Sequence, residues 1–337
     1  MTTIYDIAHA CGVSIATVSR VLNGSNKVSP KTREKVLSAM REQNYSPNPF
    51  ARGLGLDSMK MIGILCTDVS DAFFAKAVSL VEHGLRKRGL DVILGCSGTE
   101  LPQKKKYLQL LLNKHVDAII LIGSPFREED DNSHLAAAAS QVPIIAINSL
   151  IDLPNIYSVV CDIATGMKKT VELLAAQSHT SIVYLYDQMT YSGQQKIKGY
   201  KEGLAACGLP VRDELIIHLP ERTLEAAQTA IEQLMDAGTH FSAIMTSEDI
   251  LSIGAQKALV ARGLSMPVTG CNNSILAECS TPSLTSVDNR LDVLCPTAVN
   301  LLSSILNGEG ESTPSQTIFP PLLVFRDSFP SKHAADK

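Results

Sequence analysis

Residues 3–22 of the chain have the sequence TIYDIAHACGVSIATVSRVL, which carries the signals of two short helices separated by a tight turn. Apolar residues recur at helical spacing and predict a first helix over about residues 4–10. Gly12 permits a tight turn after it. Ser14 can cap a second helix, which we expect over residues 15–22, by accepting a backbone N–H bond.

A third, longer helix is predicted to begin at Ser29-Pro30, where serine is a good N-cap and proline fits the first helical position. It is expected to extend to about Tyr45. The side chains expected to face inward along it are Val36, Leu37 and Met40. Two short helices followed by a longer one are typical of a helix-turn-helix, whose second helix enters the major groove of DNA.

The exposed face of that second helix supplies the candidate base-reading residues Ile15, Ala16 and Arg20. Arg20 can donate two hydrogen bonds to guanine, and the two apolar residues can contact a thymine methyl group. Other polar residues suit contacts to the DNA backbone. These residues are Thr3, Tyr5, Ser14, Thr17, Ser19, Asn23 and Ser29. The alternative is a generic three-helix bundle whose polar face is only solvated.

Residues 47–59 form a candidate hinge. Asn48 can cap a short helix that has Pro49 at its first position, but two glycines weaken this helix in isolation. We therefore expect it to be coil when free and ordered on DNA, with Leu54 as an apolar wedge in the minor groove. The other candidate hinge contacts are Ala51 and Arg52. A plain interdomain linker is the alternative.

Charge is distributed unevenly along the 337 residues. Residues 1–56 contain seven Lys and Arg against three Asp and Glu, a net charge of +4, so the rest of the chain carries −8. A basic head on an acidic body suggests that the head binds a polyanion. No apolar run approaches the 18 residues of a membrane span, and the eight scattered cysteines show no zinc-ligand spacing. We expect a reduced, cytoplasmic protein without a metal or other cofactor.

Beyond residue 60, β-branched apolar runs alternate with helical patterns in two successive series, which predicts two doubly wound parallel-sheet lobes with a cleft between them. The predicted strands are 61–66, 90–95, 117–122 and 143–148 in the first series and 181–186, 214–219, 242–246 and 267–271 in the second. The predicted helices are 74–88, 102–114 and 133–140, then 164–177, 192–207, 223–237 and 250–262. Ligands are expected beyond the carboxyl ends of the strands.

The run TIYDIAHACGVSIATVSRVLNGSNKVSPKTREKVLSAMREQNYSPNPFARGLGL, residues 3–56, resembles the DNA-binding head and hinge of the lactose/galactose repressor family. The resemblance implies that Ile15, Ala16 and Arg20 contact bases and that Leu54 enters the minor groove. It also implies a body similar to periplasmic sugar-binding proteins, and a homodimer that binds a pseudo-palindromic operator in double-stranded DNA. Pro49 and Gly53 are departures within the hinge.

The resemblance also implies domain boundaries, because the family's chain crosses between its lobes three times, here near residues 159, 288 and 318. The expected domains are a helix-turn-helix domain (1–46), the hinge (47–59), a two-lobed body (60–330) and a tail (331–337). Lobe 1 is expected over 60–158 and 288–317, and lobe 2 over 159–287 and 318–330. The short tail lacks heptads, which argues against a coiled-coil tetramer.

The effector site implied by the resemblance departs from the family's usual pattern. Phe73, Phe74 and Asp162 match it, but a lysine replaces the usual arginine and two asparagines replace aspartates. The lysine is Lys196 and the asparagines are Asn148 and Asn272, while the pair Glu248-Asp249 stands where the family usually has Asn-Asp. Lysine is a compact charge without arginine's planar fork, and asparagine removes a negative charge. These changes favour a sugar acid or sugar phosphate; a neutral sugar held by other partners is the alternative.

No nucleotide-binding loop, nucleophile elbow or metal-binding motif is present in the sequence, so no catalytic residue is assigned. The charge runs 104–106 and 128–131 are interpreted as solvated faces. The sequence thus predicts a transcription regulator, expected to repress because a bound dimer obstructs polymerase. The alternatives are a constitutive DNA-binding dimer controlled by a protein co-regulator, and a sugar-metabolising enzyme with a regulatory head.

Overall fold

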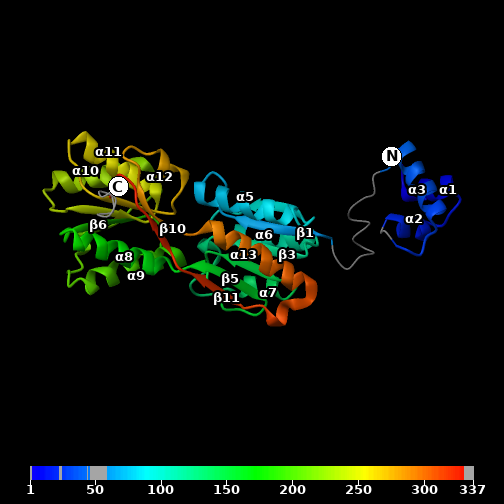
Figure 1. Ribbon diagram of the computed structural model, residues 1–337. Coiled ribbons are helices and arrows are strands. Elements are labelled where there is room, and N and C mark those ends of the chain that lie inside the picture. Colours follow the sequence, from blue (N-terminus) through cyan, green and yellow to red (C-terminus); the bar gives the residue numbers. More distant parts are fainter. Residues whose placement is uncertain (1, 23–24, 44, 46–58, 330–337) are drawn as a thin grey trace, which may run out of the picture. The chain divides into compact units, whose positions relative to one another are not determined.

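The computed structural model describes residues 2–22, 25–43, 45 and 59–329, and the chain divides into a helical head and a larger α/β body (Figure 1). The expected fold class is confirmed: helix-turn-helix helices come first, and a body of two sheet-based lobes follows. The hinge residues Asn48, Ala51, Arg52 and Leu54 and the tail lie outside the described residues, as does Asn23.

The head consists of three helices, which are α1 (Ile4–Cys11), α2 (Ile15–Leu22) and α3 (Pro30–Glu42). Gly12 ends α1 in the left-handed conformation, with φ 60°, which favours glycine. The N–H of Thr17 donates to the Ser14 side chain at 3.2 Å, so the predicted cap of α2 is confirmed. Ser29 caps α3 as predicted, but α3 ends before Tyr45 and Leu37 is 42% exposed rather than buried.

One small apolar core holds these helices together, and it is formed by Ile7, Ala8, Cys11, Val18, Val21, Val36 and Met40. The buried residues of α2, Val18 and Val21, lie three apart, which is one helical turn. The opposite face of α2 therefore carries the polar and exposed residues of this short helix.

The first lobe is built on a six-stranded sheet in the order β11-β5-β4-β3-β1-β2. β3 pairs in parallel with β1 and β4, and β5 pairs in parallel with β4 and β11. Both faces of the central strands are covered, so β3 and β4 are continuous apolar runs. The strands are β1 (Met61–Cys66), β2 (Asp91–Cys96), β3 (Ala118–Ile122), β4 (Ile144–Ile147), β5 (Ile156–Cys161) and β11 (Gln316–Phe319).

Helices α5 and α13 share one apolar core with this sheet, although they lie far apart in the chain. Gly84 of α5 permits their close approach, because a Cβ atom there would lie 3.2 Å from the Val299 side chain of α13. The helices of the first lobe are α5 (Ala72–Arg86), α6 (Leu101–Asn113), α7 (Ser133–Ala139) and α13 (Leu291–Ser304). Short helical turns are η1 (Ser124–Phe126), η3 (Ile305–Glu309) and η4 (Gly310–Ser312).

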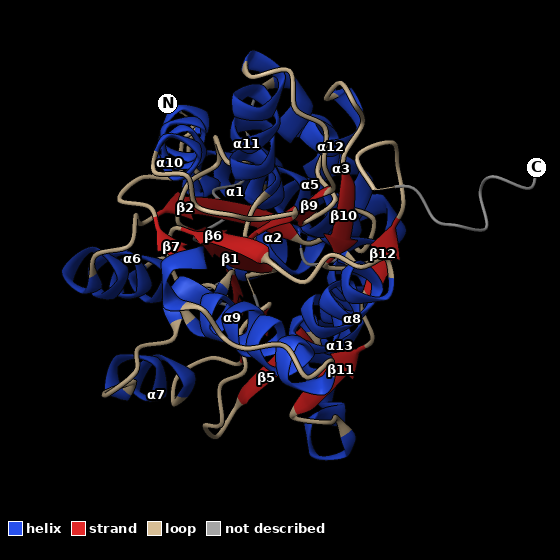
Figure 2. Cartoon of the chain, turned by 90° about the vertical axis from the view of Figure 1, so that its left-hand side faces the viewer, coloured by secondary structure: helices blue, strands red, loops and turns tan. Residues whose placement is uncertain are grey.

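The second lobe has a six-stranded sheet in the order β12-β10-β9-β8-β6-β7, with β12 antiparallel to β10. Helices α8 and α9 cover one face and α10 and α11 the other (Figure 2). The strands are β6 (Ile182–Tyr186), β7 (Ile216–His218), β8 (Ala243–Thr246), β9 (Val268–Cys271), β10 (Thr285–Asp288) and β12 (Leu322–Val324). The helices are α8 (Ile163–Ala176), α9 (Tyr191–Ala206), α10 (Leu224–Asp236), α11 (Asp249–Ala261), α12 (Ile275–Cys279) and the turn η2 (Asp213–Leu215).

The chain passes between the two sheets three times: after β5, after β10 and between β11 and β12. The expected crossings near 159 and 318 fall inside strands, because the paired register of β5 and β11 continues to Cys161 and Phe319. The crossing expected near 288 lies at the last residue of β10. The chain therefore leaves β5 and β11 one or two residues after the expected crossings and leaves β10 at the expected residue.

Candidate functional site

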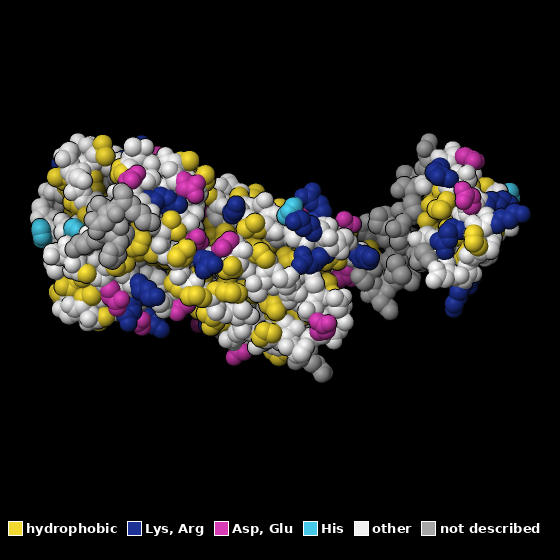
Figure 3. Space-filling model, in the orientation of Figure 1, with side chains coloured by type: hydrophobic (Ala, Val, Ile, Leu, Met, Phe, Trp, Pro, Cys, Tyr) yellow, Lys and Arg dark blue, Asp and Glu magenta, His cyan; other side chains and the backbone are white. Residues whose placement is uncertain are grey.

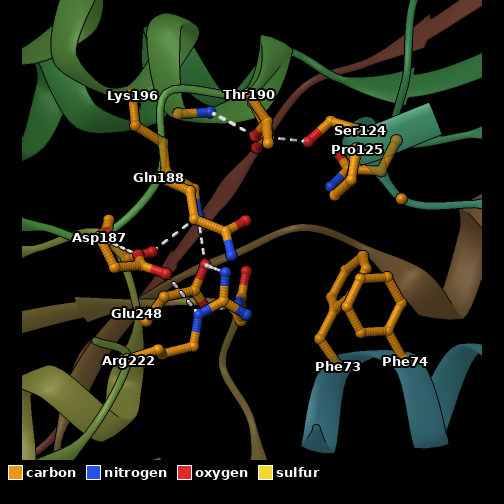
Figure 4. A pocket seen from close by; sticks show the side chains of 16 residues that line it. Phe73, Phe74, Ser124, Pro125, Asp187, Gln188, Thr190, Lys196, Arg222 and Glu248 are labelled. Carbon is orange, nitrogen blue, oxygen red and sulfur yellow. Dashed lines mark hydrogen bonds and ion pairs between the residues drawn. The ribbon is translucent and has the colours of Figure 1, made fainter. Parts of the chain in front are cut away.

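The candidate effector site lies between the lobes of the body, at the carboxyl ends of the parallel strands (Figure 4). In the first lobe the strand order reverses between β1 and β3, and in the second between β6 and β8. Side chains that follow these four strands line one chamber. Open α/β sheets bind ligands at such reversal points. We call this space the inner chamber; it is lined by residues 73–74, 123–125, 148, 187–188, 190, 192–193, 196, 222, 247–248 and 272.

Two phenylalanines from the N-terminus of α5 form the apolar wall of the inner chamber. The rings of Phe73 and Phe74 meet edge to face, with 5.4 Å between their centroids. Asp71 fixes their backbone, because its Oδ1 accepts from Phe73 N at 2.8 Å and from Phe74 N at 3.4 Å. Gly123, with φ 106°, gives the Phe74 ring its space, since a Cβ there would lie 2.5 Å from Phe74 Cε1. Such a wall can pack against the C–H face of a sugar ring.

A buried ion pair forms the opposite wall. Lys196 of α9 is only 4% exposed, and its Nζ donates to Ser247 O at 2.6 Å and to Glu248 Oε1 at 3.0 Å. Burial disfavours the Lys196 ammonium, but the neighbouring Cys271 and Glu248 outweigh it and raise the pKa of Lys196. The other oxygen of Glu248 accepts from the Asn272 side chain, which in turn accepts from Asn289. Lys196 is therefore charged and already paired.

Arg222 connects the two lobes across the chamber. Its Nη1 donates to Asp71 Oδ2 of the first lobe at 2.7 Å, and its Nε donates to Asp187 Oδ2 of the second lobe at 2.6 Å. Burial opposes the charge on Arg222, but Glu248, Asp187 and Asp71 raise its pKa. Asp187 also accepts a bond from the Ser247 hydroxyl at 3.0 Å. Arg222 thus has carboxylate partners on both sides of the cleft.

Further contacts join the lobes, among them a hydrogen bond from Gln194 Nε2 to Glu129 Oε1. The Ser124 hydroxyl of the first lobe donates to Thr190 Oγ1 of the second at 2.8 Å (Figure 4). The guanidinium of Arg127 lies over the Tyr191 ring, 4.8 Å from its centroid. Polar contacts between the lobes thus extend beyond the residues that line the chamber.

The charge balance of this site differs from the one expected from sequence. The described residues of the inner chamber include two cations, Lys196 and Arg222, and two carboxylates, Asp187 and Glu248. Asp71 adds a third carboxylate at its edge. Asp187 and Asp71 offset the negative charge that is lost at Asn148 and Asn272, so the site has no unpaired excess of positive charge.

Six of the eight candidate effector residues line the inner chamber, namely Phe73, Phe74, Asn148, Lys196, Glu248 and Asn272. Asp249 lines only the outer part of the cleft, where it is bonded within its own lobe by Ser274 N at 2.7 Å and by Ser286 Oγ at 2.6 Å. Asp162 lines neither space. Asp162 caps α8, accepting from Thr165 N at 3.2 Å, and its contact with an effector stays a prediction.

Sequence reasoning missed several lining residues, although a signal was present. Asp187, Gln188 and Thr190 follow the predicted strand that ends at Tyr186, and Ser124 and Pro125 follow the strand that ends at Ile122. The end of a buried parallel strand is the place where ligand-binding side chains are expected.

The charge run 104–106 is not simply a solvated face. Lys104 is 2% exposed, pairs with Glu128 and donates to Pro125 O at 2.7 Å, whereas Lys105 and Lys106 are exposed. The buried lysine thereby holds the loop that presents Ser124 to the chamber.

In the head, the three candidate base-reading residues Ile15, Ala16 and Arg20 are all exposed on α2. Tyr5 is 68% exposed, and Ser19 is partly exposed. The candidate backbone contacts Thr3, Ser14 and Ser29 are exposed caps of α1, α2 and α3, and Thr17 shares a 2.9 Å hydrogen bond with Ser14. On the face drawn in Figure 3, Lys and Arg side chains lie across the head.

The described part of the chain contains neither a membrane-spanning helix nor a metal-binding cluster. No helix there is long and apolar enough to span a membrane. No group of three or more His, Cys, Asp or Glu residues there has the arrangement of a metal site.

Comparison with known proteins gives matches along nearly the whole chain. Residues 3–48 match the family of bacterial regulatory proteins called the lacI family, and residues 59–306 match the periplasmic binding proteins and sugar binding domain of LacI family. A transcriptional regulator of the helix-turn-helix type from Lachnoclostridium phytofermentans is 44% identical over 96% of this chain and 98% of its own length. The regulator DegA of Bacillus subtilis is 32% identical over 97% of this chain and 98% of its own length.

A solved structure has the same fold. The Lac repressor dimer bound to operator and the anti-inducer ONPF superimposes with a TM-score of 0.85 at 24% identity. The match covers 98% of this chain and 99% of that one. The two-lobed body and the helix-turn-helix head are thus both found in a known architecture.

Proposed function

The chain belongs to the LacI family of bacterial regulatory proteins, which are transcription regulators and not enzymes, and from this membership we propose that it is a homodimeric, cytoplasmic repressor controlled by a neutral carbohydrate. The observation that carries the effector class is the inner chamber, where a phenylalanine wall faces cations already paired with carboxylates.

The exposed face of α2 supports the DNA-binding part of the proposal. Arg20 donates to guanine in the major groove, while Ile15 and Ala16 make apolar contacts with bases. Two heads of a dimer bind the two half-sites of a pseudo-palindrome. A dimer of the Lac repressor, which has the same fold, was solved on its operator. Repression follows because a dimer on its operator obstructs polymerase.

The chemistry of the inner chamber supports a neutral sugar. Pyranose rings have apolar C–H faces, which pack on Phe73 and Phe74, and hydroxyl edges, which donate to the carboxylates of Asp187 and Glu248. The side chain of Asn148 supplies both a donor and an acceptor. A phosphate or sugar acid would meet three carboxylates around Arg222, and like charges in a partly buried site repel strongly.

The contacts between lobes explain how a ligand can act on the head. A ligand shifts a conformational equilibrium only by its difference in affinity for the two states. A sugar bound between Phe74 of the first lobe and Glu248 of the second contacts both lobes only when they are closed. We propose that this change of closure alters the operator affinity of the two heads.

A thermal-shift screen of the purified protein against neutral sugars, sugar acids and sugar phosphates tests the effector class. A ligand at 100 times its Kd stabilises the folded state by about 2.7 kcal/mol. Stabilisation by a neutral sugar that also changes operator binding is the expected result. An anionic hit alone contradicts the neutral class, and a complete lack of hits favours control by a protein co-regulator.

Lysine substitutions on one helix test the location of the site. Lys196→Met removes the buried ammonium and leaves Glu248 without its 3.0 Å partner, so the effector response should be lost. Lys198→Met is the matched control, because the Lys198 side chain is 59% exposed on the same helix. Operator binding without effector should stay within about twofold of wild type in both variants. An unchanged effector response in Lys196→Met means that the site is misplaced.

A further inference from the structure

The inner chamber opens into a second space in the cleft, which we call the outer compartment and define by the residues 67–68, 70–72, 98–99, 249–250, 274 and 276 that line it and not the inner chamber. The two spaces are continuous, because they share six lining residues. The shared residues are Phe73, Phe74, Gln188, Arg222, Glu248 and Asn272.

The free volumes of the two spaces are very different. The inner chamber has about 40 Å³ of free volume, and the outer compartment about 660 Å³. A single water needs roughly 10–15 Å³ by this kind of measure, so the inner chamber as it stands holds a few waters. The outer compartment, by contrast, is within the range of about 300–1,000 Å³ usual for ligand pockets.

The inner chamber is narrow because side chains occupy it. The amide of Gln188 extends toward the middle of the chamber (Figure 4), and within the described residues its side chain has no hydrogen-bond partner. This amide can move aside for one sugar ring without breaking a bond. Arg222 stays at the passage, fixed by Asp71 and Asp187. The chamber therefore takes one ring at most, and any further part of a ligand enters the outer compartment.

The walls of the outer compartment have the chemistry of a sugar subsite. The Thr67 side chain is buried, and neither its hydroxyl nor that of Thr99 has a hydrogen-bond partner among the described residues. Hydrogen bonds from Ser70 lower the pKa of Asp68, so this carboxylate is an ionised acceptor for sugar hydroxyls. The apolar part of the wall is formed by Ala72, Ile250 and Leu276.

The charge of the outer compartment further restricts the chemical class of the ligand. Four carboxylates line the outer compartment against one cation, Arg222, among the described residues. They are Asp68, Asp71, Glu248 and Asp249. A negatively charged second unit is therefore disfavoured. Both lobes contribute walls, so a second ring contacts both lobes, as the first ring does.

We infer that the outer compartment is a second sugar subsite, so that the effector is a neutral disaccharide with one ring on Phe73 and Phe74 and the other beside Thr67 and Thr99. This inference rests on the proposed function, because it assumes that a neutral sugar binds in the inner chamber. Arg222 and Glu248 line both spaces and lie where the glycosidic link passes.

Calorimetry with the full-length protein tests the inference. The probes are glucose and galactose, and the disaccharides cellobiose, maltose, lactose and melibiose. At least one disaccharide should bind 30-fold or more tightly than either of its component monosaccharides. Monosaccharides that bind as tightly as every disaccharide overturn the second subsite and leave the proposed function intact. No binding by any of the six sugars contradicts the proposed function as well.

A substitution at the exposed Thr99 separates the two spaces, because this residue lines only the outer compartment. Thr99→Trp fills the compartment and should weaken disaccharide binding at least tenfold, with monosaccharide binding within twofold of wild type. Thr239→Trp is the control, because Thr239 follows α10 and lines neither space. Equal losses for both sugar classes in Thr99→Trp, or no loss for either, overturn the inference.

Discussion

The hydrogen bond between Arg222 and Asp71 joins the two lobes. We expect it to stabilise their closed arrangement when no effector is bound. Asp71→Asn tests this bond with little other disturbance. Oδ1 of Asp71 caps α5, and asparagine caps helices about as well as aspartate, so the cap is retained. Only Oδ2, which accepts from Arg222 at 2.7 Å, is replaced by a neutral amide.

The magnitude follows from the burial of the pair. The side chains of Arg222 and Asp71 are 26% and 18% exposed, so the bond is screened only in part. If the amide oxygen of the asparagine keeps the cap, its nitrogen faces Arg222 and cannot accept, so the whole bond is lost. A hydrogen bond to a charged group contributes about 1.5–3 kcal/mol. The substitution should therefore destabilise the closed form by about 1.5–3 kcal/mol, which shifts the open-to-closed ratio about 10- to 150-fold.

Small-angle X-ray scattering of the effector-free protein measures this shift, because opening of the lobes increases the radius of gyration. Asp236→Asn is the control: Asp236 pairs with Arg262 inside the second lobe and should leave the scattering unchanged. Identical scattering from wild type and Asp71→Asn would refute the argument that this bond holds the lobes closed.

Three other predictions concern packing, DNA recognition and pH. Gly199→Ala should lower the free energy of unfolding by about 1–3 kcal/mol in urea titrations, because the added Cβ atom would lie 2.1 Å from Ala164 O. An unchanged urea midpoint would contradict the tight contact between α8 and α9. Arg20→Ala should lose about 1–3 kcal/mol of discrimination at one base pair, and undiminished preference in competition binding means that Arg20 does not contact bases. Burial raises the pKa of Asp249 to about 6, so the folded state holds this proton more tightly than the unfolded chain. Wild type should therefore lose up to about 3 kcal/mol between pH 4 and 7 relative to Asp249→Asn, and parallel stability curves for the two proteins exclude this titration.

The parts of the fold that sequence analysis predicted correctly are those with strong local signals. Gly12, Ser14 and Ser29 mark the helix ends of the head, and α2 has the predicted bounds. Helix α13 was missed. It contains Pro296 in its interior, and proline in that position usually indicates a helix end. Burial against α5 and the sheet stabilises α13, and a contact between such distant segments cannot be predicted from the local sequence.

The candidate site was predicted in part because a matched position does not fix the direction of a side chain. Asp162 matches the family's pattern but caps its own helix, whereas Asp187 and Asp71 supply charge from loops for which no match was made. Lys104 looked like part of a solvated run until the structure showed its carbonyl and carboxylate partners. Each of these outcomes depends on contacts between segments distant in sequence.

The three crossings between the sheets have a consequence for synthesis of the protein on the ribosome. The first lobe needs β1–β5 from the early part of the body but also α13 and β11, which end at Ser304 and Phe319. Until those segments emerge, the apolar face of α5 that packs on α13 lacks its cover. Neither lobe can therefore be completed from one continuous stretch of nascent chain. The body must complete its folding late, and before then its exposed apolar surface is the natural target of chaperones.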